Sequence, residues 1–225
     1  MSRMFPFITT TWNPLGGECL HNCSYCWAKK LAKTYNMQKY TGYPTLNTKE
    51  IYRTFKPSEF VFVCDMTDLF GAWVPSEMIQ AILNIIWLSH AKFLLLTKNP
   101  ARYHEFMLPP NCVAGATIET DLDYSYGDAP GRIDRIHAMQ GLAHQRKMVS
   151  IEPIMMPGYD FTDYIIEIHP EFVAVGYDNY GNKLIEPDLE IVEEMIKQFE
   201  SVGIKVYRKT IREPLTISGK QITEQ

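Results

Sequence analysis

The sequence predicts an α/β fold in which about six or seven strand–helix units form one domain around a parallel sheet. Short apolar runs alternate with longer amphipathic stretches over most of the chain, a pattern typical of repeated strand–helix units. At 225 residues the chain is long enough to bury a core of its own, and no linker-like segment divides it. Repeated units of this kind favour right-handed crossovers between neighbouring parallel strands.

Seven short segments are rich in β-branched, aromatic and other apolar residues and are expected to be strands. The run from Lys92 to Leu96 is almost wholly apolar, as expected for a strand that is covered on both faces. In chain order the predicted strands are 5–11, 60–63, 92–96, 112–118, 147–151, 172–176 and 204–207.

Five longer stretches carry apolar residues at helical spacing. Pro75 opens one of them, because proline is favoured at the first position of a helix. The chain is polar after Pro214, so we expect a domain over 1–213 and a polar tail over 214–225. The predicted helices are 27–37, 75–87, 130–145, 159–168 and 189–202.

Three of the five cysteines, Cys19, Cys23 and Cys26, lie in one short segment with spacings of three and two intervening residues. Three thiolates on one loop can hold three corners of a [4Fe–4S] cluster, and the fourth iron then keeps an open position for a small molecule. A structural zinc site is the alternative; it needs a fourth ligand, which Cys64, Cys112 or His21 would have to supply. A disulfide framework is disfavoured by the odd number of cysteines.

Polar and charged residues follow the predicted strands. In parallel strand–helix folds ligands bind where the carboxyl ends of the strands meet, so we expect these residues to surround one site. The alternatives are ordinary polar loop residues, a salt bridge between Lys98 and Glu119, and simple core packing for Cys64. The candidates are Cys64, Asp65, Thr67, Asp68, Thr97, Lys98, Glu119, Ser150, Glu152, Tyr177 and Asp178.

The cysteine segment, with Tyr25 directly before the third cysteine, resembles the signature of the radical S-adenosylmethionine (radical SAM) superfamily. Other stretches are similar, in order along the chain, to an uncharacterised radical SAM family of phage and microbial genomes, and more distantly to spore photoproduct lyase. The resemblance implies a partial, open TIM-like barrel. The similar stretches are Thr-Thr-Trp-Asn-Pro at 10–14, Asp-Met-Thr-Asp-Leu-Phe at 65–70, Leu-Thr-Lys-Asn-Pro at 96–100, Ala-Thr-Ile-Glu at 116–119 and Ser-Ile-Glu-Pro at 150–153.

The resemblance also implies an activity and two cofactors, a [4Fe–4S] cluster and S-adenosyl-L-methionine (SAM). One electron from an external reductant would cleave SAM to methionine and a 5′-deoxyadenosyl radical that abstracts hydrogen, in an oxidoreductase or lyase reaction. The chain lacks the Gly-Gly-Glu that the superfamily usually carries after its second strand, so the contact to the SAM ammonium is not fixed by the resemblance. The residues that it assigns to SAM are Asp65, Thr67 and Asp68 for the ammonium, Lys98 for the carboxylate, Tyr25 with Trp27 for the adenine, and Thr97, Glu119, Ser150 and Glu152 for the remaining polar groups.

The substrate is less constrained. The segment 205–212 contains four cations among apolar residues, and it either grips a phosphate backbone or forms a last strand with solvated cations. Lys209 coincides with a lysine of the resembled family, and Cys64 would return a hydrogen atom to a product radical if it acts as in the lyase. Tyr177 and Asp178 are further candidates on the substrate side. A nucleotide or nucleic acid is the first substrate class, and a peptide or small metabolite is the second.

Composition limits the partners and the location. The formal net charge of −4 argues against wrapping of nucleic acid along the whole surface. The longest apolar run, 81–88, is far shorter than the roughly 20 residues that span a bilayer, so we expect no membrane insertion. The few cysteines and the lack of an export signal lead us to expect a reducing cytoplasm. The two other function classes are a zinc-stabilised nucleic-acid-binding module and an electron-transfer iron–sulfur protein.

Overall fold

The computed structural model describes residues 4–215 and contains an open sheet of seven parallel strands. The strands lie in the order β1-β4-β5-β6-β7-β8-β9, so the order in the sheet is the same as the order along the chain. This confirms the predicted single-domain α/β fold. The strands are β1 (Thr10–Trp12), β4 (Phe60–Val63), β5 (Lys92–Thr97), β6 (Cys112–Thr117), β7 (Lys147–Ile151), β8 (Phe172–Val175) and β9 (Lys205–Arg208); β2 (Leu15–Gly16) and β3 (Thr45–Leu46) form a separate antiparallel pair.

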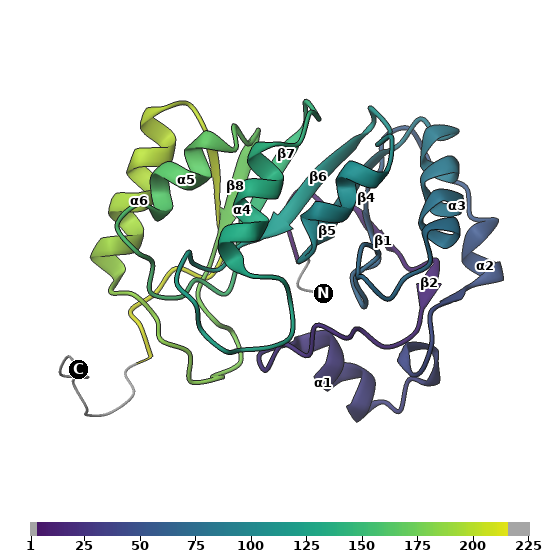
Figure 1. Ribbon diagram of the computed structural model, residues 1–225, viewed down its shortest axis with the longest axis horizontal. Coiled ribbons are helices and arrows are strands. Elements are labelled where there is room, and N and C mark those ends of the chain that lie inside the picture. Colours follow the sequence, from purple (N-terminus) through teal and green to yellow (C-terminus); the bar gives the residue numbers. More distant parts are fainter. Residues whose placement is uncertain (1–3, 216–225) are drawn as a thin grey trace.

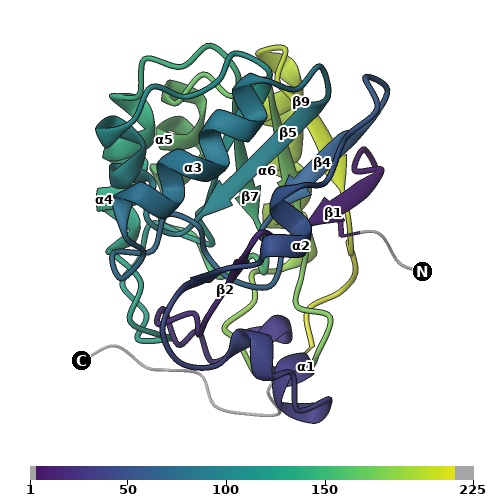
Figure 2. The same cartoon turned by 90° about the vertical axis from the view of Figure 1, so that its right-hand side faces the viewer.

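Helices connect the strands and cover one face of the sheet. Figure 2 shows α3, α4 and α5 on one side of the strands. The helices are α1 (Trp27–Thr34), α2 (Thr48–Ile51), α3 (Ser76–Trp87), α4 (Arg132–Gln140), α5 (Phe161–Glu167) and α6 (Leu189–Ser201), with the short 3₁₀ helices η1 (Gln38–Tyr40) and η2 (Pro100–Glu105).

Each face of the sheet has its own core, because successive strand residues point to opposite faces. On β5, Phe93 and Leu95 join the larger cluster, which includes the buried residues of the helices. Leu94 belongs instead to a second cluster on the opposite face, together with Phe62 and Met148. The strands are therefore apolar on both sides, as their sequences predict.

The first predicted strand, 5–11, was placed too early, since only Thr10–Trp12 pairs in the sheet. Phe5 and Phe7 lie in the second core cluster instead. The ring of Phe7 lies 5.3 Å from that of Phe60, 4.9 Å from Phe172 and 4.7 Å from Tyr207, measured between centroids. This aromatic packing connects the first strands of the sheet with the last ones, and it holds the segment of Phe5 and Phe7 without strand pairing.

Two predicted helices end earlier than expected. The helix predicted over 27–37 stops at Thr34, and Asn36 adopts a left-handed backbone with φ of 48°. The helix predicted over 130–145 stops at Gln140, before Gly141. The pairs β2–β3 and the short helices were not predicted, because two to six residues carry too little periodicity. Most of the predicted tail, residues 216–225, lies outside the described residues.

The parallel arrangement brings the carboxyl ends of all seven strands to one edge of the sheet. Between β1 and β4 the chain makes a long excursion that carries the three cysteines and α1 across this edge, and α1 lies beyond the strand ends in Figure 1. No helix of the described residues has the length and apolar character needed to cross a membrane.

Candidate functional site

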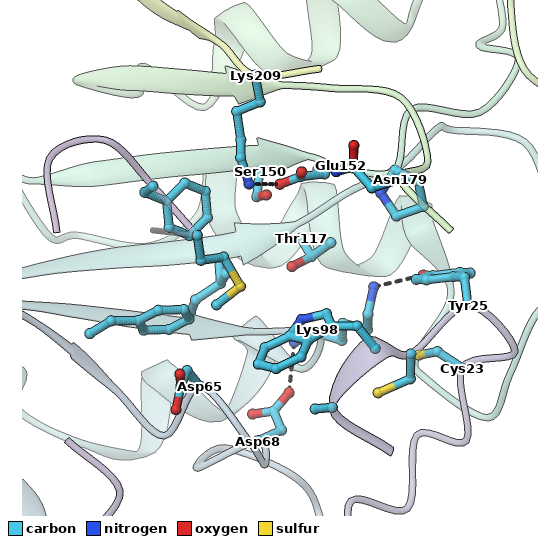
Figure 3. A pocket seen from close by; sticks show the side chains of 18 of the residues that line it. Cys23, Tyr25, Asp65, Asp68, Lys98, Thr117, Ser150, Glu152, Asn179 and Lys209 are labelled. Atoms are coloured by element: carbon cyan, nitrogen blue, oxygen red, sulfur yellow. Dashed lines mark hydrogen bonds and ion pairs between the residues drawn. The ribbon is translucent and has the colours of Figure 1, made fainter. Parts of the chain in front are cut away.

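A cavity of about 1050 Å³ opens at the carboxyl edge of the sheet. Figure 3 shows its polar side chains in two groups, with Asp65, Asp68, Lys98, Tyr25 and Cys23 on one side, Ser150, Glu152, Asn179 and Lys209 on the other, and Thr117 between them. Its walls include nearly all the residues predicted for the site: Cys19, Cys23, Tyr25, Cys26, Cys64, Asp65, Thr67, Asp68, Thr97, Lys98, Ser150, Glu152, Tyr177, Asp178 and Lys209. Glu119 is the predicted residue that is not on the wall.

The cysteine loop is held in place by its own backbone and by the loop 121–131. The Cys26 thiol caps α1 by accepting a hydrogen bond from the Lys29 N–H at 3.3 Å. The Ser24 N–H donates to the Tyr126 carbonyl at 2.8 Å. Gly127 fits closely below the loop, because a Cβ there would lie 2.6 Å from the carbonyl oxygen of His21. The cysteine positions therefore depend on contacts about 100 residues away in sequence.

The three cysteines are half-buried free thiols on one cavity wall. Burial raises the pKa of the Cys19 thiol to about 12, with a further contribution from the negative charge of Asp68. Burial also raises the pKa of Cys23, against the opposing effect of the positive charge of Lys98. Metal ligands must be thiolates, so a bound metal centre has to supply the positive charge that stabilises them.

The described residues show no preformed metal-ion site. Within residues 4–215, no three or more His, Cys, Asp or Glu side chains come together in an arrangement that would hold a metal ion. Zinc draws its sulfur ligands to about 2.3 Å from one centre, whereas a [4Fe–4S] cluster distributes its cysteine ligands over separate iron atoms.

His21, within the cysteine loop, is paired with Asp68. The His21 Nε2 lies 2.8 Å from Asp68 Oδ2, and both side chains are buried. The same carboxylate accepts hydrogen bonds from the Thr97 hydroxyl at 2.7 and 2.9 Å, from the Lys98 N–H at 2.8 Å and from the Phe70 N–H at 2.9 Å. Burial alone would raise the pKa of Asp68, but its hydrogen bonds and the His21 charge lower it. Asp68 thus anchors the loop to the ends of β4 and β5, and its oxygens are already engaged.

Asp65 and Thr67 provide the less engaged polar groups on the same wall. Asp65 accepts a hydrogen bond from the Asn13 side chain at 2.5 Å. Burial raises the pKa of Asp65, against this hydrogen bond. The Thr67 hydroxyl is buried and has no partner among the described residues. Of the candidates for an ammonium, these two have acceptor capacity to spare.

Lys98 and Glu119 form the salt bridge that the sequence left as an alternative. Glu119 is fully buried behind the cavity wall and also accepts hydrogen bonds from the Tyr25 hydroxyl and from Arg135 Nη1, the latter at 3.0 Å. Burial would raise its pKa, but the charges of Lys98 and Arg135 and the hydrogen bonds hold it well below the usual value. Glu119 therefore orients Tyr25 and Lys98 and does not itself face the cavity.

The opposite wall carries a second ion pair, between Glu152 and Lys209. Burial raises the pKa of Glu152, against the effect of the Lys209 charge. The ammonium of Lys209 also lies 4.6 Å from the centre of the Phe5 ring. Ser150 lies on the same wall, and its side chain has no protein partner among the described hydrogen bonds.

The loop after β8 is shaped by Asp178, whose carboxylate accepts hydrogen bonds from the Tyr180 N–H at 3.1 Å and the Asn182 N–H at 2.5 Å. Lys30 of α1 donates to the Asn182 side chain, which ties this loop to the cysteine excursion. Tyr177 is buried and donates to the Pro187 carbonyl at 3.0 Å, so it supports the loop from behind. Asp178 and Tyr177 thus organise the rim of the cavity.

Cys64 ends up buried at the cavity wall, where it follows the last residue of β4. Its φ of 57° is in the left-handed region, which is uncommon for a residue other than glycine. Burial raises the pKa of its thiol to about 12. Cys112 is the first residue of β6, at the amino ends of the strands and away from the cavity, and it is buried.

Cations of the segment 205–212 are largely neutralised. Arg208 pairs with Glu193 at 2.8 Å, and Arg212 pairs with Glu186 at 2.7 Å. Lys209 is engaged by Glu152, as described above. The first half of the segment forms the last strand, β9, and three of the four cations of the segment are paired.

Sequence reasoning missed several residues that hold the site together. Arg132 and Arg135 of α4 are buried, and both lie within ion-pair distance of Glu119. Asn13 orients Asp65, and His21 was considered only as a zinc ligand. An arginine pair one helical turn apart was the available signal, but its acidic partner could not be identified without the fold.

One comparison with known proteins gave a match. A family model described as "Protein of unknown function (DUF5131)" matches residues 4–210, which is most of the chain. Neither the curated proteins nor the solved structures gave a match.

Proposed function

The chain belongs to the DUF5131 family, and we propose that it is a radical SAM enzyme whose [4Fe–4S] cluster is held by Cys19, Cys23 and Cys26. One observation carries the proposal. The three cysteines of one loop and the polar residues at the ends of β4 to β8 line a single cavity at the carboxyl edge of a parallel sheet. A cavity of about 1050 Å³ lies at the upper end of the size range of small-molecule sites and is large enough for a cofactor beside a substrate.

The proposal extends to the shape of the sheet. Its seven strands follow one another in chain order, and its two faces have separate cores. A sheet wound in one direction in this way is the arrangement of a TIM-type barrel, so we interpret it as a partial barrel whose first and last strands do not pair.

In this proposal the two walls of the cavity have different roles. When bound, the cluster and SAM supply one-electron cleavage of SAM to methionine and a 5′-deoxyadenosyl radical, which abstracts hydrogen from the substrate. Asp65 and Thr67 would accept hydrogen bonds from the SAM ammonium, Lys98 would balance its carboxylate, and Tyr25 would hold its adenine. Asp68, Thr97 and Glu119 position these groups, because their own polar atoms are engaged with the protein.

The opposite wall would receive the substrate. Glu152 and Lys209 provide a paired acid and base there, and Ser150 a hydroxyl. Tyr180, at the rim, is 60% exposed and offers an aromatic face to a planar group. The exposed ring of Tyr180 is the observation that favours a nucleotide or a nucleic-acid base, because bases stack on aromatic side chains. A peptide or small metabolite is the second class.

The two other function classes have weaker support. A zinc-stabilised module needs four convergent ligands, and the described residues do not provide such a group. An electron-transfer cluster needs a fourth cysteine ligand; Cys112 is at the far edge of the sheet, which leaves Cys64 alone. Free thiols at all five cysteines suit a reducing compartment such as the cytoplasm.

The test is anaerobic reconstitution with iron and sulfide, followed by addition of SAM and a strong reductant. We expect about four irons per chain, a change in the electron paramagnetic resonance (EPR) spectrum of the reduced cluster on SAM addition, and formation of 5′-deoxyadenosine. A single bound zinc, or a cluster whose EPR spectrum does not change when SAM is added, would exclude the proposal. Deuterated nucleosides, peptides and metabolites then identify the substrate by deuterium transfer into 5′-deoxyadenosine.

A further inference from the structure

Positive charge is concentrated in the excursion between β1 and β4. Residues 27–56 contain seven lysines and arginines and one acidic residue, Glu50, so this segment carries a net charge of +6. The whole chain carries −4, which leaves −10 for all the other residues. A charge asymmetry of this size within one domain indicates a surface for an anionic partner.

The lysines of α1 form a stripe on one side of the helix. Lys33 lies three residues after Lys30 and four after Lys29, and all three are exposed, whereas Ala28 on the opposite side is buried. Like charges at these spacings repel one another and destabilise a helix. Lys29 lies 3.5 Å from Glu18 Oε1, but within residues 4–215 Lys30 and Lys33 have no acidic partner. The charge of the stripe is therefore largely uncompensated.

This lysine stripe lies beside the mouth of the cavity. Helix α1 is beyond the strand ends, apart from the helices that cover the sheet (Figures 1 and 2). Its first two residues, Trp27 and Ala28, line the cavity. The Lys30 ammonium donates to the Asn182 side chain, which belongs to the same loop as the cavity residue Tyr180. An anion bound on the stripe would therefore lie next to the entrance.

Other segments around the cavity offer less positive charge. The loop 121–131, which contacts the cysteine loop, contains three aspartates and no lysine or arginine. In the segment 205–212, three of the four cations are paired with glutamates. The positive surface at the cavity therefore lies on the side of α1.

Exposed aromatic rings accompany this charge. Tyr35, directly after α1, is 69% exposed, and Tyr43 of the same excursion is 91% exposed. Tyr180 adds an exposed ring at the rim of the cavity. Lysines that bind phosphates, together with aromatic rings on which unpaired bases stack, are the two elements of a surface for single-stranded nucleic acid.

An anionic membrane is the alternative partner for a stripe of lysines. A helix that lies in a membrane surface inserts an exposed apolar face. In α1 this face is turned toward the protein, where Ala28 is buried and Trp27 lines the cavity. The apolar part of a membrane anchor is therefore missing, which favours nucleic acid.

We propose that the lysine stripe of α1 binds the phosphates of a single-stranded polynucleotide, DNA or RNA, and that one base of this strand enters the cavity past Tyr180. The inference rests on the proposed function for the reaction in the cavity, and it makes the substrate a strand and not a free nucleotide. Binding of the strand itself requires neither the cluster nor SAM. A duplex fits less well, because a base must first leave its stack to reach the cavity.

The test removes the charge and the ring separately. Lys30→Gln combined with Lys33→Gln takes two positive charges from the stripe. Lys92→Gln combined with Lys197→Gln is the matched control, since it removes the same charge from two exposed lysines at the amino end of β5 and on α6. Tyr180→Ala removes the ring at the rim, and Tyr180→Phe restores it.

Each full-length variant is reconstituted anaerobically and titrated into short fluorescent oligonucleotides, namely single-stranded DNA, single-stranded RNA and duplex DNA. Fluorescence anisotropy gives the dissociation constants between about 50 and 200 mM salt. We expect the unmodified protein to bind a single strand more tightly than the duplex, with an affinity that falls as the salt concentration rises.

The charge variant K30Q/K33Q should bind the strand roughly tenfold or more weakly at low salt. The slope of log affinity against log salt concentration should decrease by about 1.4, because each phosphate contact with a single strand contributes about 0.7. K92Q/K197Q should match the unmodified protein. Y180A should bind roughly fivefold or more weakly with an unchanged slope, because it loses stacking and no charge, and Y180F should recover the affinity.

The inference would be overturned if K30Q/K33Q bound the strand as tightly as K92Q/K197Q, or if the duplex bound as tightly as the single strands. Sedimentation with phosphatidylserine vesicles, without binding to either DNA or RNA, would assign the stripe to a membrane surface and would also overturn it. Strand binding that depends on the stripe, in a protein that forms no 5′-deoxyadenosine, would refute the proposed function alone. Cleavage of SAM without strand binding would refute the inference alone.

Discussion

Glu119→Gln is expected to destabilise the protein severely, although it changes a single charge and almost no volume. The Glu119 carboxylate is fully buried and faces three cations: Lys98, Arg135 Nη1 at 3.0 Å and Arg132 Nε at 3.8 Å. A glutamine has one oxygen in place of two, so its NH₂ group would face donors where an acceptor is needed. The cations would remain buried without their counter-charge.

The magnitude follows from this burial. Removing one partner of a buried ion pair costs about 3–5 kcal/mol. For a chain of this length each kcal/mol lowers the melting temperature by about 2–4 °C, so the fall should be about 6–20 °C. Circular dichroism during thermal and urea unfolding, without added metal, measures both quantities.

Glu193→Gln provides the matched control, because its ion pair with Arg208 is partly exposed and should contribute at most about 1 kcal/mol. The double variant Lys98→Met, Glu119→Gln should recover part of the lost stability, since it removes one of the stranded cations. The reasoning would be refuted if E119Q lost no more stability than E193Q, or if the double variant were no more stable than E119Q alone.

The remaining predictions concern acid stability, the thiols and the loop. The pKa of Glu119 is lower in the folded than in the unfolded protein, so its contribution to stability is complete above about pH 4.5 and is lost as the pH falls below that value. The free energy of unfolding in urea should therefore decline less steeply for E119Q than for E193Q between pH 5 and pH 3. Serine at any cysteine of the loop, for example Cys23→Ser, should remove the visible absorbance of the reconstituted cluster. Cys112→Ser, at the amino end of β6, should keep this absorbance. Retained absorbance in all three loop variants would contradict the ligand assignment. Gly127→Ala should lower the free energy of unfolding by about 1–3 kcal/mol and reduce the iron content, because its Cβ would clash with the His21 carbonyl. Gly141→Ala, where a Cβ would have an ordinary contact at 3.5 Å, is the neutral control. Equal stability of the two variants would exclude this contact as a constraint on the loop.

The strands were largely predictable because each is a buried apolar run. Strand β7 was predicted with its observed bounds, Lys147–Ile151, since both of its faces are covered and its polar flanks are clear. The first strand was misplaced because Phe5 and Phe7 are as apolar as a strand. Their partners, such as Phe172 and Tyr207, lie more than 160 residues away and cannot be identified from local pattern.

The location of the site was predictable, but the division of tasks within it was not. Strand-end polar residues gather at one edge in any parallel sheet, so the cavity wall followed from the fold class. Asp65 and Asp68 look equivalent in sequence. Within residues 4–215, however, four donor groups surround the Asp68 carboxylate, whereas Asn13 is the one side chain that donates to Asp65. Glu119 lies behind the cavity wall because it pairs there with Arg132 and Arg135 of α4. Such distinctions depend on partners from other elements.

The lengths of the strands have a consequence for how copies of this protein meet in solution. The central strands β5 and β6 have six residues each, whereas the two edges of the open sheet, β1 and β9, have three and four. An edge exposes unpaired backbone groups on which a second chain can add, and short edges offer few of them. Lys205 on β9 adds a charge to one of these edges. The open sheet thus leaves little backbone to template aggregation, even though its strands are among the most apolar segments of the chain.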